Sequence, residues 1–268
     1  MEFSCARVIA DWDAFASEWD QLFSRSHMQV PFLRFGYLRA WWQTLGGAEW
    51  QPESSALRII TAREQGELVG IAPLFLCEKP GWQPALRLIG SVEVSDYLDV
   101  LAPAEALEEF LDGLLAFLRE DPELSVYPLD LLNLREDSQT LQALPRATGR
   151  NGYVFSEERL QPSPYIALTE SWETYLAGLS KKQRHEIRRK LRNAENRHQT
   201  EWYVVQDEAR LEVETDDFLA MMRQDPGKAA FLNPAMREHL QASARFAFEQ
   251  GQLQLLFLTF EGHKAAAY

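Results

Sequence analysis

The sequence is poor in the residues that build disulfide frameworks and metal sites. Its 268 residues include two cysteines, Cys5 and Cys77, which are too few for a disulfide framework and form no C-x-x-C pair. The five histidines include no H-E-x-x-H motif and no cluster with the spacing of metal ligands. We therefore expect no disulfide framework and no metal site.

Long apolar runs and an N-terminal leader are also lacking. No apolar run approaches the roughly 20 residues that span a bilayer. The first residues, Met-Glu-Phe-Ser-Cys-Ala-Arg, do not have the basic region and apolar run of a signal peptide. These absences predict a cytoplasmic protein with no membrane span.

Positive charge is scarce overall but is concentrated in one place. The formal charge of −13 and the pI near 4.9 argue against broad, non-specific nucleic-acid binding. Between residues 180 and 198, however, eight Lys or Arg accompany two acids, which gives this stretch +6. We therefore expect this stretch to meet something anionic, either a ligand or the rest of the protein.

The composition, with 46% hydrophobic and 12% aromatic residues, is that of a globular protein with one large or two smaller domains. Apolar periodicity predicts helices at 11–24, 37–45, 103–119, 138–149, 171–198, 210–223 and 234–249. It predicts strands at 57–62, 67–75, 86–89, 97–101, 129–134, 153–155, 165–168, 201–206, 253–260 and 264–268. Asp11 is expected to cap the first helix, and residues 225–227 to form a loop. The Ser180-x-x-Gln183 pattern predicts a fresh helix start inside 171–198.

One pattern occurs twice. Two helices and a hairpin, turning at Gly66 in the first case and at Gly262 in the second, indicate a unit repeated at the domain scale. After the first hairpin the pattern continues for about 90 residues, whereas the second hairpin lies at the end of the chain. We therefore expect the second unit to be incomplete and the natural protein to be longer. The alternative is a complete protein whose last strand closes a sheet.

Several short motifs occur in order along the chain. The motifs in the first half are Trp19-x-x-Leu22, Pro31-Phe32, Ala40-Trp41-Trp42, Gly70-Ile-Ala-Pro-Leu74, Leu86-x-Leu-Ile-Gly90 and Ser95-Asp-Tyr97. Those in the second half are Leu179-Ser-Lys-Lys-x-Arg184, Ile187-Arg-Arg-Lys-x-Arg192 and, more weakly, Lys228-x-x-Phe231-Leu232 and Leu258-x-x-x-Glu261-Gly262-x-x-Ala265. With these motifs in this order, the chain resembles the BioF2-like, or CelD-like, acetyltransferase family of the GNAT superfamily, which is akin to the FemAB peptidyltransferases.

The resemblance implies an α+β fold with two tandem GNAT-like units, the second truncated. The implied division is 1–168 for the first unit, 169–199 for a bridging basic helical segment and 200–268 for the start of the second unit. It also implies a pyrophosphate loop of the pattern Gln/Arg-x-x-Gly-x-Gly/Ala. The best match, Arg146-Ala-Thr-Gly149-Arg-Asn151, has the wrong last residue and lies in the first unit. We therefore expect the chain to lack part of its donor site.

The basic stretch supplies the first candidate binding residues. At 100° per residue, Lys181, Arg184, Arg188 and Arg192 fall on one stripe of a helix. This stripe could bind a phosphate or sugar-nucleotide group of an acceptor, with Arg as a bidentate donor and Lys as a point charge. A solvated helix paired with an acidic surface is the alternative. Lys228, beside a glycine turn, is a second candidate for a phosphate contact, with an ordinary surface lysine as the alternative.

Two further groups are candidates for chemistry or stacking. Asp96 could act as a base and Tyr97 could donate a proton to a leaving thiolate; a turn aspartate and a half-buried tyrosine are the alternative. Trp42 could stack on a substrate, or Trp41 and Trp42 could be one core and one partly exposed tryptophan.

The resemblance implies transfer of an acyl group from an acyl-CoA co-substrate to an amine, in cell-envelope polysaccharide or peptide biosynthesis, with no tightly bound cofactor. Two alternatives stay open. One is a FemAB-like transferase that uses aminoacyl-tRNA, and the other is a non-catalytic binding or assembly module.

Overall fold

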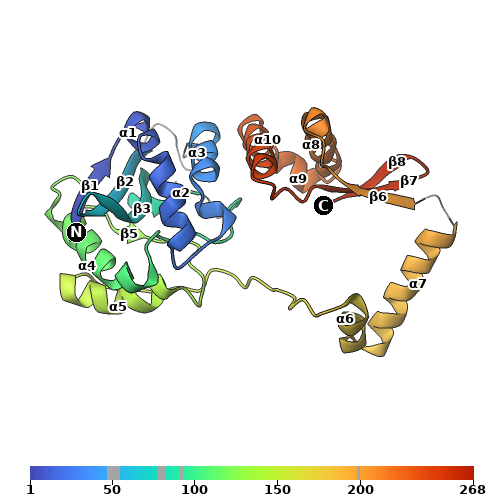
Figure 1. Ribbon diagram of the computed structural model, residues 1–268, viewed down its shortest axis with the longest axis horizontal. Helices are drawn as coiled ribbons and strands as arrows, with labels where there is room; N and C mark the ends of the chain where they lie inside the picture. The colour runs from blue at the N-terminus through green and yellow to red at the C-terminus, as the bar shows by residue number, and fades with distance from the viewer. Residues whose placement is uncertain (47–54, 78–82, 91–92, 198–199) are drawn as a thin grey trace. The chain divides into compact units, whose positions relative to one another are not determined.

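The computed structural model describes residues 1–46, 55–77, 83–90, 93–197 and 200–268. The chain divides into two compact units, Met1–Glu158 and Arg159–Tyr268 (Figure 1). Both units combine sheet and helices, so the predicted α+β class is confirmed. The functional division at 168 and 199, and the assignment of both units as GNAT-like, remain predictions.

Unit 1 is built on a five-stranded sheet of order β1-β2-β3-β4-β5. Strands β1 (Glu2–Ala6), β2 (Ala56–Glu64), β3 (Glu67–Cys77) and β4 (Ala85–Leu88) are antiparallel neighbours, whereas β5 (Leu129–Asp130) pairs in parallel with β4. The central strand β3 is largely apolar and mostly buried, since both faces of the sheet are covered along it.

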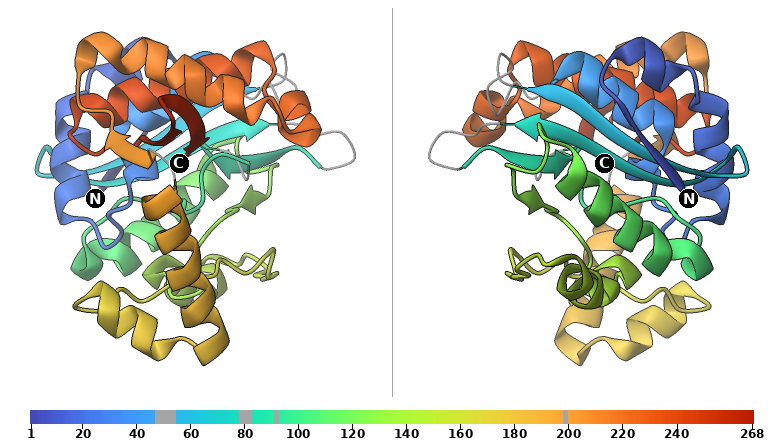
Figure 2. Two further views of the ribbon diagram at one scale, coloured as in Figure 1. Left: turned by 90° about the vertical axis from the view of Figure 1, so that its right-hand side faces the viewer. Right: turned by 90° about the vertical axis from the view of Figure 1, so that its left-hand side faces the viewer.

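Helices cover the two faces of the unit 1 sheet. Helices α1 (Ile9–Asp13), α2 (Ala16–Arg25) and α3 (Phe35–Thr44), with the 3-10 turn Pro31–Leu33, come before β2. Helices α4 (Leu107–Glu120) and α5 (Gln139–Asn151) come later, α4 after the 3-10 turn Ala104–Ala106. Trp41 of α3 lies 5.6 Å from Phe75, while Phe110 of α4 lies against Gly70. Because Gly70 and Phe75 point to opposite faces of β3, α3 and α4 lie on opposite sides of the sheet (Figure 2).

Unit 2 has a three-stranded antiparallel sheet of order β6-β7-β8. It begins with α6 (Trp172–Gly178) and α7 (Lys181–Arg197), and continues with β6 (Thr200–Val204), α8 (Glu208–Met222), α9 (Pro226–Phe231) and α10 (Pro234–Glu249). Strands β7 (Leu256–Phe260) and β8 (His263–Ala267) form the final hairpin. Its core is small and contains Val205, Leu211, Leu255 and Phe257.

The two units share the order and the pairing of their first elements, as the predicted repeat suggests. In unit 1, the described residues between β1 and the β2–β3 hairpin form three α-helices, and β1 pairs with β2. In unit 2, β6 is followed by three α-helices and the β7–β8 hairpin, and β6 pairs with β7. The leading strand of unit 2, β6, was predicted at 201–206. The leading strand of unit 1 was not foreseen, because Glu2–Ala6 alternates between exposed and half-buried positions and has no long apolar run.

Several predicted elements are wrong. Residues 97–101 are not a strand and make one isolated bridge, between Leu101 and Ile71. The strand expected at 129–134 is two residues long. Residues 153–155 and 165–168 lie outside strands, and Tyr165 and Leu168 are about nine-tenths exposed. A strand needs a neighbouring strand for its backbone hydrogen bonds, and β-propensity alone does not supply one.

Two expected helix boundaries also change. The helix predicted at 11–24 is interrupted at Ala14 and Phe15, and it begins after Val8, so that Asp11 is not its cap. The loop expected at 225–227 is the start of α9, because the Asp225 carboxylate accepts hydrogen bonds from the amides of Gly227 and Lys228. In the part of the chain that the structure describes, no helix is long and apolar enough to cross a membrane.

Candidate functional site

The basic helix α7 begins at a side-chain cap. The backbone N–H of Gln183 donates to the Ser180 hydroxyl oxygen at 3.3 Å, as the capping pattern predicts. The Gln183 side chain accepts from that same hydroxyl at 2.8 Å, so it does not reach back to the Ser180 amide. The predicted break between two helices is confirmed, since α6 ends at Gly178 and α7 starts at Lys181.

Two of the four predicted binding residues hold α6 against α7. The Arg184 guanidinium donates to the carbonyl oxygens of Leu176 and Ala177, at 3.3 and 3.0 Å, where α6 ends. Arg188 donates to the Glu173 carboxylate at 2.7 Å. Helix-end carbonyls and a carboxylate both attract cations, so these contacts occupy both guanidinium groups within the hairpin.

A second face of α7 carries a hollow of about 370 Å³. Its lining residues are Lys182, His185, Glu186, Arg189 and Arg192. Their spacing of three and four residues places them on one side of the helix. Arg189 donates to both oxygens of Glu186, at 3.0 and 2.7 Å, and this hydrogen bonding lowers the pKa of Glu186. Three cations and one carboxylate leave the hollow basic, and such a surface suits an anionic ligand.

The structure therefore separates the predicted stripe. Arg192 lines the hollow, Lys181 is exposed at the start of α7, and Arg184 and Arg188 lie on the α6 side. Sequence reasoning missed Lys182, His185 and Arg189 as neighbours of Arg192. Their spacing of 3, 4 and 3 residues is the signal that could have identified this face.

Asp96 and Tyr97 lie in an ordered, non-strand segment of unit 1. The segment is anchored at Ser95, whose hydroxyl lies 2.9 Å from the Tyr37 hydroxyl and whose carbonyl accepts from Asn133 at 2.7 Å. Asp96 is exposed, and Tyr97 is half-buried beneath the Arg135 guanidinium, 5.5 Å from its ring centre. An exposed carboxylate is accessible to a substrate, which leaves the predicted base role open.

A buried polar cluster lies close to this segment. Asp99 accepts from the Ser138 hydroxyl at 2.6 Å and from the Val100 amide at 2.8 Å, and it faces His27 at 3.4 Å. The other ring nitrogen of His27 lies 3.0 Å from the Ala102 carbonyl oxygen. Burial lowers the pKa of His27, but the hydrogen bond and charge of Asp99, with the Ala102 carbonyl, outweigh burial and raise that pKa. The Asp99 and His27 side chains are essentially inaccessible, so this cluster is structural.

The remaining sequence candidates lie apart from one another along the chain. Trp41 is buried and Trp42 is half-buried against Phe75, as the packing interpretation expects. Lys228 is exposed on the short helix α9. Gly149 lies inside α5, so the Arg146–Asn151 match to a pyrophosphate loop is helical. Binding roles for Trp42 and Lys228 stay predictions.

Comparison with known proteins finds a family match at the end of the chain. Residues 181–268 match the family described as "Acetyltransferase (GNAT) domain". This segment is similar to that domain. It includes α7 and the whole β6–β8 sheet, so the basic hollow belongs to it.

Solved structures extend the likeness to the rest of the chain. FemX matches 96% of this chain and 57% of its own length, at a TM-score of 0.54 and 16% identity. A conserved protein of unknown function from Bacteroides thetaiotaomicron VPI-5482 matches 99% of this chain and 74% of its own, at 0.52 and 15%. At such identities the likeness establishes the fold, and this chain spans 57% of FemX. No curated protein matches the sequence.

The resemblance inferred from the sequence is confirmed at the level of a GNAT domain in a chain with a FemX-like fold. The narrower BioF2-like assignment, the acyl-CoA donor and a role in cell-envelope biosynthesis stay predictions.

The segment that matches the GNAT family holds a buried carboxylate in its core. Glu214 of α8 accepts from the Tyr203 hydroxyl at 2.9 Å and from Arg210 and Lys264. The Lys264 ammonium also bonds Asp217 and lies 4.3 Å from the centre of the Phe257 ring. Burial lowers the pKa of Lys264, and its hydrogen bonds to Asp217 and Glu214 outweigh this and raise it. This network ties α8 to β6 and β8.

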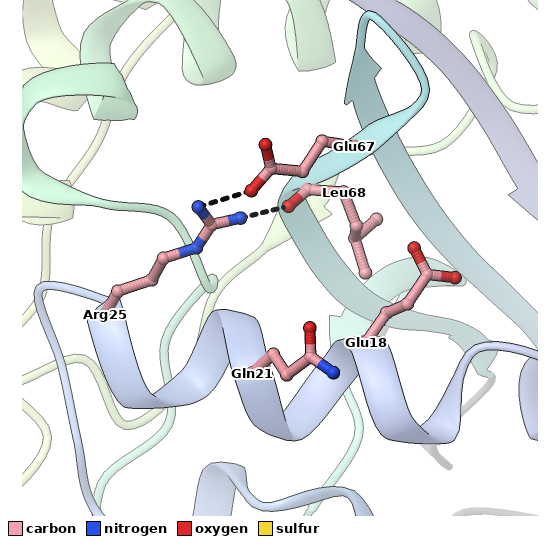
Figure 3. Close-up of a pocket in the computed structure, with 5 residues that line it drawn as sticks. All are labelled: Glu18, Gln21, Arg25, Glu67 and Leu68. Carbon is pink, nitrogen blue, oxygen red and sulfur yellow. Dashed lines mark hydrogen bonds and ion pairs between the residues drawn. The ribbon is translucent and has the colours of Figure 1, made fainter.

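A second hollow, of about 230 Å³, lies on unit 1 between α2 and the start of β3 (Figure 3). Arg25 crosses it, bonding the Glu67 carboxylate at 2.7 Å and the Leu68 carbonyl at 2.8 Å. Glu18 is bonded by Arg63. With these groups paired, the hollow presents little unmatched charge. Across the described ranges, no group of three or more His, Cys, Asp or Glu could hold a metal ion.

Proposed function

We propose that the protein transfers an acyl group from an acyl-CoA to an amine acceptor, and that the acceptor carries phosphate or another anionic group. The observation that carries this proposal is the match of residues 181–268 to the GNAT acetyltransferase domain. The acceptor class is supported by the basic hollow of α7, in which Lys182, Arg189 and Arg192 lie around one space.

The chemistry is direct attack by a neutral amine on the thioester carbonyl. The nitrogen forms a bond to the acyl carbon, the carbon–sulfur bond breaks, and the thiolate leaves. A base takes the proton of the amine, and an acid can protonate the thiolate. Asp96 and Tyr97 are the residues that we propose for these roles, because Asp96 is exposed and Tyr97 adjoins it. Most of the rate enhancement would come from positioning.

The test is release of free CoA thiol from acetyl-CoA in the presence of amine acceptors with and without a phosphate group. We expect release that depends on the acceptor and is faster with the phosphorylated member of each pair. Asp96→Asn should lower kcat by about 10²-fold or more if Asp96 is the base. Glu93→Gln, at an exposed carboxylate in the same segment, is the matched control. Absence of acceptor-dependent thiol release would overturn the proposal.

A second candidate is an aminoacyl-tRNA-dependent transferase, which the FemX-like fold favours. Retention of aminoacyl-tRNA with a steep salt dependence, without any thermal shift on adding acetyl-CoA, would support this candidate. A chain that responds to neither donor fits the third possibility, a binding or assembly module.

A further inference from the structure

The β2–β3 and β7–β8 hairpins match in turn geometry and in the position of their β-bulge. Each turns through two residues with positive φ: Gln65 and Gly66 at 51° and 86°, and Glu261 and Gly262 at 49° and 79°. In β2–β3 the pairing passes from Arg63↔Leu68 to Ala62↔Gly70, so that Val69 is an extra residue. In β7–β8 it passes from Thr259↔Lys264 to Leu258↔Ala266, so that Ala265 is extra. Both bulges lie three residues after the turn glycine, which fixes the alignment of the two sheets.

This alignment identifies equivalent rows across the sheets. In unit 1, Phe3, Ala62 and Gly70 stand side by side on β1, β2 and β3. In unit 2 the same row is formed by Trp202, Leu258 and Ala266 on β6, β7 and β8.

In unit 1 this row is covered by helix α4. The Phe3 ring lies 5.9 Å from that of Phe110 and 6.1 Å from that of Phe117. Gly113 lets Phe3 approach, because a Cβ there would lie 2.3 Å from its ring. A Cβ on Gly70 would lie 2.2 Å from the Phe110 ring, and Ala62 is fully buried. Helix α4 therefore seats directly on the row.

In unit 2 the equivalent row is open. Trp202 is 69% exposed and Leu258 is 40% exposed. Neighbouring positions on the same face are Val204, Leu256, Phe260 and Tyr268, with Thr200 and His263 paired to Phe260 at one end. None of these is Asp, Glu, Lys or Arg. The opposite face does have its cover, because Tyr203, Phe257 and Ala267 pack with Leu211 and Phe218 of α8.

We propose that the face of Trp202, Leu258 and Ala266 docks an amphipathic helix of the same kind as α4. The side chains of this face limit the size of two side chains on the docking helix. Ala266 carries the methyl group that Gly70 lacks, so the residue at the Phe110 position must be smaller than phenylalanine, such as leucine. Trp202 is larger than Phe3. The docking helix must therefore carry glycine or alanine at the position equivalent to Gly113, three residues after the Phe110 position. The docking face does not depend on the proposed transferase activity.

The experiment adds a capped synthetic peptide to the full chain. The peptide has the sequence of Leu107–Glu120 with Phe110→Leu. We expect saturable binding, a blue shift of Trp202 fluorescence that is absent in Trp202→Ser, and a gain of peptide helicity. A peptide that also carries Gly113→Leu should bind about tenfold more weakly or worse, because its side chain would meet Trp202.

Matched variants of the chain locate the site. Leu258→Asp places a charge on the face at an already exposed position, and it should weaken peptide binding about tenfold or more. Val213→Asp makes the same change at a 63% exposed position of α8 and should leave binding unchanged. Circular dichroism checks that both variants fold.

Three results would overturn the proposal. The first is no binding up to about 1 mM peptide. The second is binding that Leu258→Asp does not weaken. The third is self-association of the chain that buries Trp202 and is lost in Leu258→Asp, which would assign the face to a second copy.

Discussion

At the scale of single residues, two buried histidines have pKa values that are shifted in opposite directions. His27 faces the Asp99 carboxylate and the Ala102 carbonyl, and its pKa is raised. Below about pH 6.5, its ordinary pKa, both folded and unfolded chains bind the proton and the stabilisation is complete. As the pH rises through the raised folded pKa, this stabilisation is lost.

We predict that Asp99→Asn lowers the free energy of unfolding by about 3–5 kcal/mol near pH 6, because it leaves a buried imidazolium without its carboxylate. Chemical denaturation from pH 5 to 9 measures the effect, and NMR titration of the His27 ring gives its pKa directly. His27→Gln should remove the pH-dependent part. A His27 pKa at or below 6.5 would refute this account.

His239 of α10 behaves in the opposite way. It is buried, with its ring 3.4 Å from the Ser243 hydroxyl, and burial lowers its pKa to about 4. Between pH 6.5 and 4 the unfolded chain binds a proton that the folded chain does not. We therefore predict that acid removes about 3 kcal/mol of stability through this residue. His239→Leu should flatten the acid limb of the stability curve; a curve parallel to that of the wild type would contradict the prediction.

Sequence patterns pointed to the right segment but did not show which of its acidic residues is buried. The Ser95–Asp99 string drew attention to Asp96, which is exposed, whereas Asp99, three residues on, is the fully buried acid. The partners of Asp99 are His27 and Ser138, both distant in sequence. Burial of this kind depends on tertiary packing, which no local periodicity records.

At the scale of elements, the α6–α7 hairpin depends on Arg184 and Arg188. We predict that Arg184→Ala frays α6, since the carbonyls of Leu176 and Ala177 lose a charged donor worth about 0.5–1.5 kcal/mol. Hydrogen–deuterium exchange at 172–178 should accelerate several-fold. Lys190→Ala, whose ammonium is 3.8 Å from Glu186 on α7 itself, is the control and should leave α6 unchanged. Unaltered exchange in Arg184→Ala would disprove the role of this arginine.

Elements with a long apolar stripe were predictable, and short ones were not. Helix α10 occupies the predicted residues 234–249, and the ends of α4 and α5 lie within four residues of expectation. Strand β5 has two residues and β1 alternates weakly, so neither has a period that stands out. The open row of Trp202 and Leu258 was also beyond sequence reasoning, because apolar alternation does not tell which face is covered.

At the scale of the whole molecule, the extended stretch after Gly152 joins two compact units. It has no helix or strand before Trp172, and Arg159 and Tyr165 are both exposed. We predict that trypsin cuts first after Arg159 and chymotrypsin first after Tyr165, since cleavage favours exposed backbone outside secondary structure. Mass spectrometry of short digests identifies the cuts. Initial cleavage inside α4 or α5 would show that the division into units is misplaced.

The placement of β1 has a consequence for the order in which unit 1 can fold. Cys5 pairs with Ile60, so about fifty more residues must be synthesised before β1 can pair with β2. Its backbone groups stay unpaired during that time, while α2 and α3 can already form from local contacts. Non-local pairing of this kind slows folding. During synthesis, β1 therefore cannot pair until β2 has been made, and the same delay separates β6 from its partner β7.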